Sequence, residues 1–358
     1  MIGTKRYCIH LLPVRIGAAL LACLMLTACS LSSDTGSSDA AQALTLLQSG
    51  SYSEAAAAYG EIISSGKDTE ANYRYLGIAY MGAGDYESAA AALESALDKA
   101  GILPSDMEYD INYYLASCYY RLGRYEDALE VYDAIVTLRP GAADAYQLRG
   151  AVRLQLGDEE GMLEDFSKAM ELNPTDYDRL ISIYEVLSGS GYGDEGLLLL
   201  NDALEQYADS MSSYDLGRVS YYAGEYESAR IALEQLDSTS DPAVALMLGR
   251  TYEALGDYNY AASIYENYLT ADASDASVYN QLGICCLKMD DYEGALEAFQ
   301  SGKAIGDSAA LQSLSFNEIV AYEYLEEFET AAELMEAYIA AYPGDESAKR
   351  EYIFLSTR

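Results

Sequence analysis

Apolar residues recur along residues 70–97 with the period of an α-helix. Tyr73, Leu76 and Tyr80 lie three and four positions apart, which places their side chains on one face of a helix. The pattern stops at Gly84, because glycine readily adopts the left-handed conformation in which helices commonly end. A second apolar pattern follows at once, so the stretch predicts two helices joined by a tight turn.

Small and capping residues in the same stretch also fit two packed helices. Asp85 follows the turn and has the short acidic side chain that caps a helix N-terminus. We expect Gly77 and Ala89 where the two helices approach each other most closely, and Leu93 and Ala96 against the following unit.

The turn belongs to a phrase, Gly-x-Tyr-x-x-Ala, that the chain repeats. Close copies and two looser copies begin at Gly50, Gly84, Gly123, Gly224, Gly256, Asp290 and Glu326. Alignment of the aromatic residues gives nine units, which start near residues 36, 70, 109, 143, 177, 210, 242, 276 and 312. A regular period of this length indicates one supersecondary unit repeated along the chain.

These units resemble tetratricopeptide repeats, which are helix-turn-helix units of about 34 residues. The resemblance covers roughly residues 36 to 345 and implies an all-α fold, an α-solenoid of about nine helix-turn-helix repeats. The last residues, 346–358, predict a C-terminal capping helix. The fourth and fifth units depart from the phrase, so we expect the most deformable joint of the array within residues 143–209.

The N-terminus has the features of a targeting segment. Three basic residues within the first 15 positions precede an apolar run, residues 16–28, that is shorter than the roughly 20 residues needed to span a bilayer. The run ends in Leu-Thr-Ala before Cys29, which resembles the lipobox of bacterial lipoproteins. This resemblance implies cleavage before Cys29 and lipidation of that cysteine. An ordinary secretory signal and an uncleaved membrane anchor are the alternatives.

Lipidation would anchor the protein on the extracytoplasmic side of a bacterial cell membrane. The residues after Cys29 are rich in Ser and Asp, and they would act as a flexible tether. Single-membrane and double-membrane hosts both stay open. The expected organisation is a signal peptide, a lipidated cysteine with its tether, the solenoid and the cap, at residues 1–28, 29–40, 41–345 and 346–358.

Acidic residues dominate the composition, with 58 Asp and Glu against 21 Lys and Arg and a net charge of −37. Removal of residues 1–28 would leave 18 basic residues and a net charge of −40. Such a surface repels the phosphates of nucleic acids and of anionic lipids. We therefore expect no nucleic acid partner and no membrane contact except through the lipid.

Residue sets for catalysis or metal binding are missing from the sequence. His10, the one histidine, lies in the signal segment, so the mature chain lacks the commonest general base. Cys118, Cys285 and Cys286 fit small core residues, with a redox role as the alternative. Residues 191–196 match G-x-G-x-x-G, but a predicted helix precedes them and their two acids would repel phosphate. We expect no enzymatic activity, no cofactor and no metal site.

In tetratricopeptide repeat proteins the first helices of successive units line a groove that holds a peptide or partner segment. The first 14 residues of the nine units sum to a charge of −2, against −38 for the rest of the mature chain. The groove positions of the family fall on Tyr113, Tyr120, Tyr214, Arg218, Tyr221, Arg250, Asn280 and Lys288. Packing between repeats and internal ion pairs are the alternatives for these side chains.

Two functions fit this pattern. The first is a membrane-tethered protein-protein interaction module that binds a peptide or partner protein in the groove. The second is an architectural subunit of a bacterial envelope or secretion assembly that uses the convex face and the edges. The partner, the oligomeric state and the form of the ligand, a C-terminus or an internal segment, stay open.

Overall fold

A computed structural model describes residues 38–101 and 105–357 of the chain. Within these residues the chain forms nineteen α-helices, one short 3₁₀-helix and no strand. The expected signal peptide, Cys29 and nearly all of the tether lie outside the described residues, so lipidation and cleavage stay predictions.

Two compact units divide the chain after Gly193. The N-terminal unit contains α2 (Ser38–Gln48), α3 (Tyr52–Ser64), α4 (Glu70–Gly82), α5 (Tyr86–Leu97), α6 (Asp106–Arg121), α7 (Tyr125–Leu138), α8 (Ala143–Leu156), α9 (Glu159–Leu172) and α10 (Tyr177–Gly189). The C-terminal unit contains α11 (Gly193–Tyr207), η1 (Ala208–Ser210), α12 (Ser213–Tyr222), α13 (Tyr226–Leu233), α14 (Pro242–Ala254), α15 (Tyr258–Ala271), α16 (Ala276–Lys288), α17 (Tyr292–Ile305), α18 (Leu311–Tyr324), α19 (Phe328–Ala341) and α20 (Glu346–Leu355). The division falls inside residues 143–209, whose deformability stays a prediction.

The order of the helices confirms the predicted all-α solenoid. In chain order the helices α2 to α19 correspond two by two to the nine units, and α20 follows them. Ala348 and Leu355 of α20 are buried, whereas Ile353 is 66% exposed. Because one side of α20 packs on α19 and the other side faces outward, this helix closes the array as a cap.

Local turn chemistry sets the geometry of each pair. Gly84 has a φ of 81°, in the left-handed region that favours glycine. The side chain of Asp85 then accepts a hydrogen bond of 3.0 Å from the backbone N–H of Ser88 and caps α5. In the last two complete pairs the same turn position holds Asp290 and Glu326, both at a φ of 63°.

The two helices of a pair cross at small residues, as the sequence predicts. A Cβ atom on Gly77 would lie 2.6 Å from Cγ of Leu93, a distance that real side chains do not adopt. Ala89 is fully buried at the same crossing. The glycine therefore allows α4 and α5 to pack closely enough to bury the apolar face of both helices.

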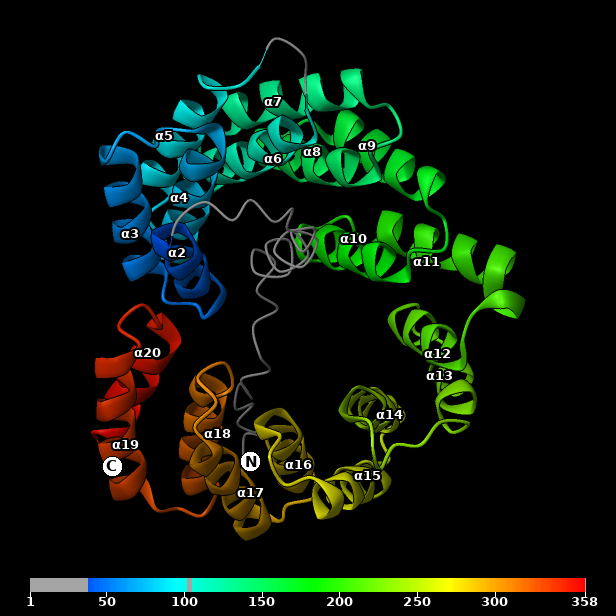
Figure 1. Cartoon of the computed structure of the whole chain (residues 1–358). Coiled ribbons are helices and arrows are strands. Elements are labelled where there is room, and N and C mark those ends of the chain that lie inside the picture. The colour runs from blue at the N-terminus through cyan, green and yellow to red at the C-terminus, as the bar shows by residue number, and fades with distance from the viewer. Residues whose placement is uncertain (1–37, 102–104, 358) are drawn as a thin grey trace. The chain divides into compact units, whose positions relative to one another are not determined.

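The first helices of the pairs, called inner helices below, form one layer in each unit. In the N-terminal unit α4 contacts α6, and in the C-terminal unit α12, α14, α16 and α18 contact one another in succession. Figure 1 shows these four helices on the inside of the curve of their unit, with α13, α15, α17 and α19 on the outside. The inner helices thus present one continuous face within the C-terminal unit.

The tyrosine of the repeated phrase joins one repeat to the next. It opens the outer helix of a pair and packs on the end of the following inner helix. Tyr292 stacks on Tyr324 with ring centroids 4.9 Å apart and an interplanar angle of 11°. The ring of Tyr86 lies 5.8 Å from the guanidinium of Arg121. The recurrence of tyrosine therefore has a structural cause, contact between repeats.

Candidate partner-binding surface

The inner helix α8 directs its arginines toward a buried carboxylate. Asp165 of α9 is 2% exposed and accepts hydrogen bonds of 2.9 and 2.6 Å from Arg149. Arg153 approaches the same carboxylate to 3.1 Å, and Arg149 also contacts Asp133 at 2.7 Å. Both arginines therefore stabilise the interior of the fourth repeat, because they pair with a carboxylate that a partner protein cannot reach.

Two further arginines of the N-terminal unit bridge successive inner helices. Arg74 of α4 contacts Asp110 of α6 at 3.0 Å, and Arg74 is itself buried. Arg179 of α10 contacts Asp144 of α8 and, at 2.8 Å, Asp176. The N-terminal unit therefore uses these cations to hold its repeats in register.

Tyr113 and Tyr120 lie on α6, where the sequence predicts groove contacts. Each is half-buried and makes an edge contact with another tyrosine ring: Tyr113 with Tyr132 at 6.2 Å, and Tyr120 with Tyr125 at 5.5 Å. Burial raises the pKa of Tyr113 to about 12, so its hydroxyl keeps its proton at neutral pH. Both rings combine packing between helices with a partly accessible surface, and a ligand-binding role for them stays a prediction.

Tyr214, Arg218 and Tyr221 come together on α12. The Arg218 guanidinium lies 4.9 Å from the centroid of the Tyr214 ring and pairs with Asp215 at 2.8 Å. Tyr221 packs against Tyr222, with ring centroids 5.4 Å apart. The three predicted residues therefore share one helix face, on which arginine and tyrosine side chains order one another.

Arg250 of α14 and Lys288 of α16 differ from the arginines described above. Arg250 is half-buried and Lys288 is exposed. Neither has a carboxylate oxygen within 4.0 Å in the part of the chain that the structure describes. Burial raises the pKa of Glu253, and the charges of both cations oppose this rise.

Glu253 is a residue of this surface that the sequence analysis missed. Its carboxylate accepts a hydrogen bond of 2.6 Å from the hydroxyl of Tyr265 on α15. Burial raises the pKa of Glu253, and the Tyr265 bond together with Arg250, Cys285 and Lys288 opposes that rise. The sequence feature that could have indicated Glu253 is its three-residue spacing from Arg250, because this spacing puts both side chains on the same side of a helix.

Asn280 is the predicted groove residue that the structure places differently. It is 1% exposed, and its side-chain oxygen accepts a hydrogen bond of 3.0 Å from Nδ2 of Asn317. The bond joins the inner helices α16 and α18. Asn280 is therefore a buried contact between two inner helices, and a partner-binding role for it stays a prediction.

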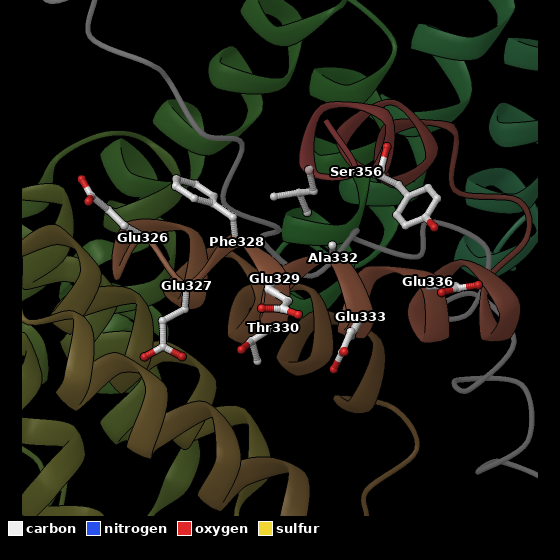
Figure 2. A pocket seen from close by; sticks show the side chains of 11 residues that line it. Glu326, Glu327, Phe328, Glu329, Thr330, Ala332, Glu333, Glu336 and Ser356 are labelled. Carbon is white, nitrogen blue, oxygen red and sulfur yellow. The ribbon is translucent and has the colours of Figure 1, made fainter. Parts of the chain in front are cut away.

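A separate hollow of about 690 Å³ lies between the start of α19 and the end of α20 (Figure 2). Its lining combines five glutamates with the side chains of the capping helix: Glu326, Glu327, Phe328, Glu329, Thr330, Ala332, Glu333, Glu336, Tyr352, Leu355 and Ser356. None of the predicted groove residues belongs to it. Its lining contains no cation, so its charge disfavours an anionic ligand.

The described residues offer little for catalysis. Cys118, Cys285 and Cys286 are buried, and burial raises the pKa of the Cys118 thiol to about 12 and that of Cys286 to about 11. Such thiols stay protonated and unreactive at neutral pH. Within residues 38–101 and 105–357 no group of three His, Cys, Asp or Glu side chains is placed to hold a metal ion. In the same residues no helix is long and apolar enough to cross a bilayer.

Comparison with known families identifies the repeats. One model of the tetratricopeptide repeat matches residues 75–143 and 246–310, and a second model of the same repeat matches residues 143–176. Together with the nine helix pairs, these matches show that the chain contains tetratricopeptide repeats.

The chain is also similar to one curated protein and to solved structures. The chain is 26% identical over 218 residues to the TPR repeat-containing protein MJ1428 of Methanocaldococcus jannaschii, a match that covers 55% of this chain and 37% of that protein. The match thus spans little more than a third of the relative's length. The crystal structure of yeast Tom70 superposes with a TM-score of 0.50 and 15% identity over 77% of this chain and 60% of that one. A tetratricopeptide repeat protein from Parabacteroides merdae gives a TM-score of 0.45 and 18% identity over 68% and 96% of the two chains. At 15% identity the likeness to Tom70 shows the fold alone.

Proposed function

We propose that this chain is a lipid-anchored interaction module that holds an extended segment of a partner protein along its inner helices. Tetratricopeptide repeat folds are typical of protein-protein interaction modules, and their stacked units create extended binding surfaces. Nothing in the described residues indicates catalysis.

The observation that carries the proposal is the shared register of Arg218 and Arg250. They occupy equivalent places on α12 and α14, two inner helices that contact each other. Arg218 orders the ring of Tyr214 beside it. Arginine forks and tyrosine rings repeated along one face supply hydrogen bonds and flat apolar surface at regular intervals, which suits an extended chain.

Crosslinking in native membranes tests the proposal. The full chain and an Arg218→Glu/Arg250→Glu variant are crosslinked and purified, and the captured proteins are compared. We expect a partner of the wild type to disappear from the variant while circular dichroism shows the helices intact. A matched control, Lys168→Glu/Arg230→Glu, reverses two charges on the outer helices α9 and α13 and should keep the partner. Capture that survives the inner-helix substitutions would refute binding along the inner helices.

The membrane anchor has its own test. We propose lipidation of Cys29 because of its sequence context alone. Metabolic labelling with an alkyne fatty acid should mark the wild-type chain and leave a Cys29→Ala variant unlabelled. Equal labelling of both chains would exclude Cys29 as the lipid site.

The second candidate, an architectural subunit, is favoured by apolar side chains on outer and terminal helices. Leu198 is 63% exposed, Ile231 56% and Ile353 66%. Single exposed apolar residues are common, but these three side chains would also provide apolar contacts to neighbouring subunits in an assembly. This function predicts that Ile231→Asp or Ile353→Asp disrupts crosslinking to neighbours, whereas the inner-helix variant leaves it unchanged.

A further inference from the structure

The last helix, α20, has the register of an inner helix. Asp345 caps it by accepting hydrogen bonds from the backbone N–H groups two and three residues further on, as Asp275 does for the inner helix α16. Eight residues after these caps, α16 has Gly283 and α20 has Ile353. A Cβ atom on Gly283 would lie 2.4 Å from Cε1 of Phe299, so this register marks where α16 crosses its own outer helix.

The corresponding side of α20 is uncovered in the described residues. Ile353 is 66% exposed, and α20 packs on α19 of the preceding repeat. Ser356 lies three residues after Ile353, on the same side of the helix, and lines the hollow of about 690 Å³ beside α19. Outer helices of this array begin a few residues after the end of their inner helix. The hollow therefore lies where an outer helix packed on α20 would begin.

The lining of the hollow combines apolar surface with unneutralised acids. Phe328, Ala332 and Tyr352 contribute the larger apolar groups. Figure 2 shows the labelled glutamates spread along α19. The glutamates of the lining are exposed, and none has a cation within 4.0 Å in the described part of the chain: Glu326, Glu327, Glu329, Glu333 and Glu336.

Three of these glutamates form a stripe on α19. Glu329, Glu333 and Glu336 follow one another at four and three residues, which places their carboxylates on one side of the helix. A helix that lies along α19 can place lysine or arginine opposite each carboxylate when it has the same spacing. An apolar stripe on that helix would cover Ile353 and the apolar part of the lining.

We propose that this hollow binds a cationic amphipathic helix of another protein, which packs on the free side of α20 as one further outer helix. Charge complementarity selects this occupant, because acids line the hollow without any basic side chain. A second copy of this chain fits poorly, since none of its described outer helices has more basic than acidic residues. The inference goes beyond the proposed function, because the hollow contains none of the inner-helix residues assigned to the extended segment.

Two synthetic helices test the inference. The cationic probe has the 14-residue sequence of α19 with Glu329→Lys, Glu333→Lys and Glu336→Lys, so it keeps the apolar face of an outer helix. The acidic comparison has the unaltered sequence of α19. A hydrocarbon staple holds both peptides helical, because isolated helices of this length are marginal in water. Fluorescence anisotropy measures their binding to the full chain in non-ionic detergent.

We expect the cationic probe to bind the wild type at least about tenfold more tightly than the acidic comparison, and more weakly as salt is added. Glu329→Gln/Glu333→Gln/Glu336→Gln in the full chain should weaken binding of the cationic probe about tenfold. Ile353→Ser should weaken it about fivefold through the lost apolar contact. Both variants change exposed side chains, and circular dichroism checks that their helices remain intact.

The matched control is Glu266→Gln/Glu293→Gln/Glu297→Gln, which removes three exposed glutamates from the outer helices α15 and α17. It should bind the cationic probe as the wild type does. An equal loss in this control would show unspecific attraction to an acidic surface and would overturn the inference, as would failure of the cationic probe to bind the wild type. Either of these results leaves the proposed function standing, because its crosslinking test depends on Arg218 and Arg250 instead.

Discussion

The hydroxyl of Tyr265 donates a hydrogen bond of 2.6 Å to the carboxylate of Glu253, and so joins the outer helix α15 to the inner helix α14 of the same repeat. Burial of both groups raises their pKa values, and the phenol therefore remains the donor at neutral pH. The bond fixes the position of the Glu253 carboxylate relative to α15. A packing contact inside the seventh repeat thus determines where a carboxylate lies on the inner-helix surface that is proposed to bind a partner.

The raised pKa of Glu253 predicts a pH-dependent stability difference. A carboxyl with a higher pKa in the folded chain binds more protons there than in the unfolded chain. Its contribution to the unfolding free energy is therefore lost as the pH rises from about 4.5 through the folded pKa. We expect Glu253→Gln to gain stability over wild type with rising pH in urea denaturation between about pH 4 and pH 8.

Glu297→Gln is the control for this experiment. Glu297 is exposed on α17, so its replacement should leave the pH dependence of unfolding close to that of wild type. A stability difference for Glu253→Gln that stays flat or shrinks with pH would contradict the assigned burial of Glu253.

Close packing of Gly249 on the Tyr265 ring predicts a steric cost for alanine. The added Cβ atom would lie 2.2 Å from the ring, and the buried ring has little room to move. Gly249→Ala should lower the unfolding free energy by about 1–3 kcal/mol. Gly60→Ala is the matched substitution, because Gly60 is helical with nothing within 4 Å of the new atom, and it should be neutral or stabilise by about 0.5–1 kcal/mol. Equal effects of the two changes in thermal denaturation would refute this account.

The buried Asp165 cluster predicts a large loss of stability when its charge is removed. Asp165→Asn would leave Arg149 and Arg153 with one carboxylate less in a poorly solvated site. We expect a loss of about 3 kcal/mol in urea denaturation. Asp133 also pairs with Arg149 but is 51% exposed, so Asp133→Asn should cost under about 1 kcal/mol. If both variants lose the same stability, the burial of Asp165 does not determine its contribution.

The left-handed turn at Glu326 predicts a stabilising substitution. Its φ of 63° is unfavourable for a residue with a Cβ atom, and glycine adopts it readily. Glu326→Gly should therefore raise the melting temperature, with a gain of a few tenths to about 1 kcal/mol. Asp290→Gly relieves the same conformation but loses the hydrogen bond of 2.9 Å from Tyr292, so its gain should be smaller. Destabilisation by Glu326→Gly would show that contacts of the Glu326 side chain stabilise the fold by more than the backbone strain destabilises it.

Part of the candidate surface was predictable from the sequence. The equivalent places of Arg218 and Arg250 follow from the repeat period, because stacked units present equivalent positions on one face. The burial of Asn280 was not predictable, because the same period does not reveal that Asn317 faces it from the next inner helix. Glu253 was missed because its anchor, Tyr265, lies twelve residues away on another helix.

The sequence by itself determined the fold, since helix periodicity, the turn at Gly84 and the cap at Asp85 are local preferences that neighbouring residues set. Only the tertiary structure decided which charges are neutralised. Arg149 and Arg250 both lie on inner helices, yet Arg149 contacts a buried carboxylate at 2.6 Å, whereas Arg250 has no carboxylate oxygen within 4.0 Å in the described residues. Ion pairing falls off steeply with distance and depends on burial, and these quantities are fixed by packing between helices rather than by the identity of a single residue.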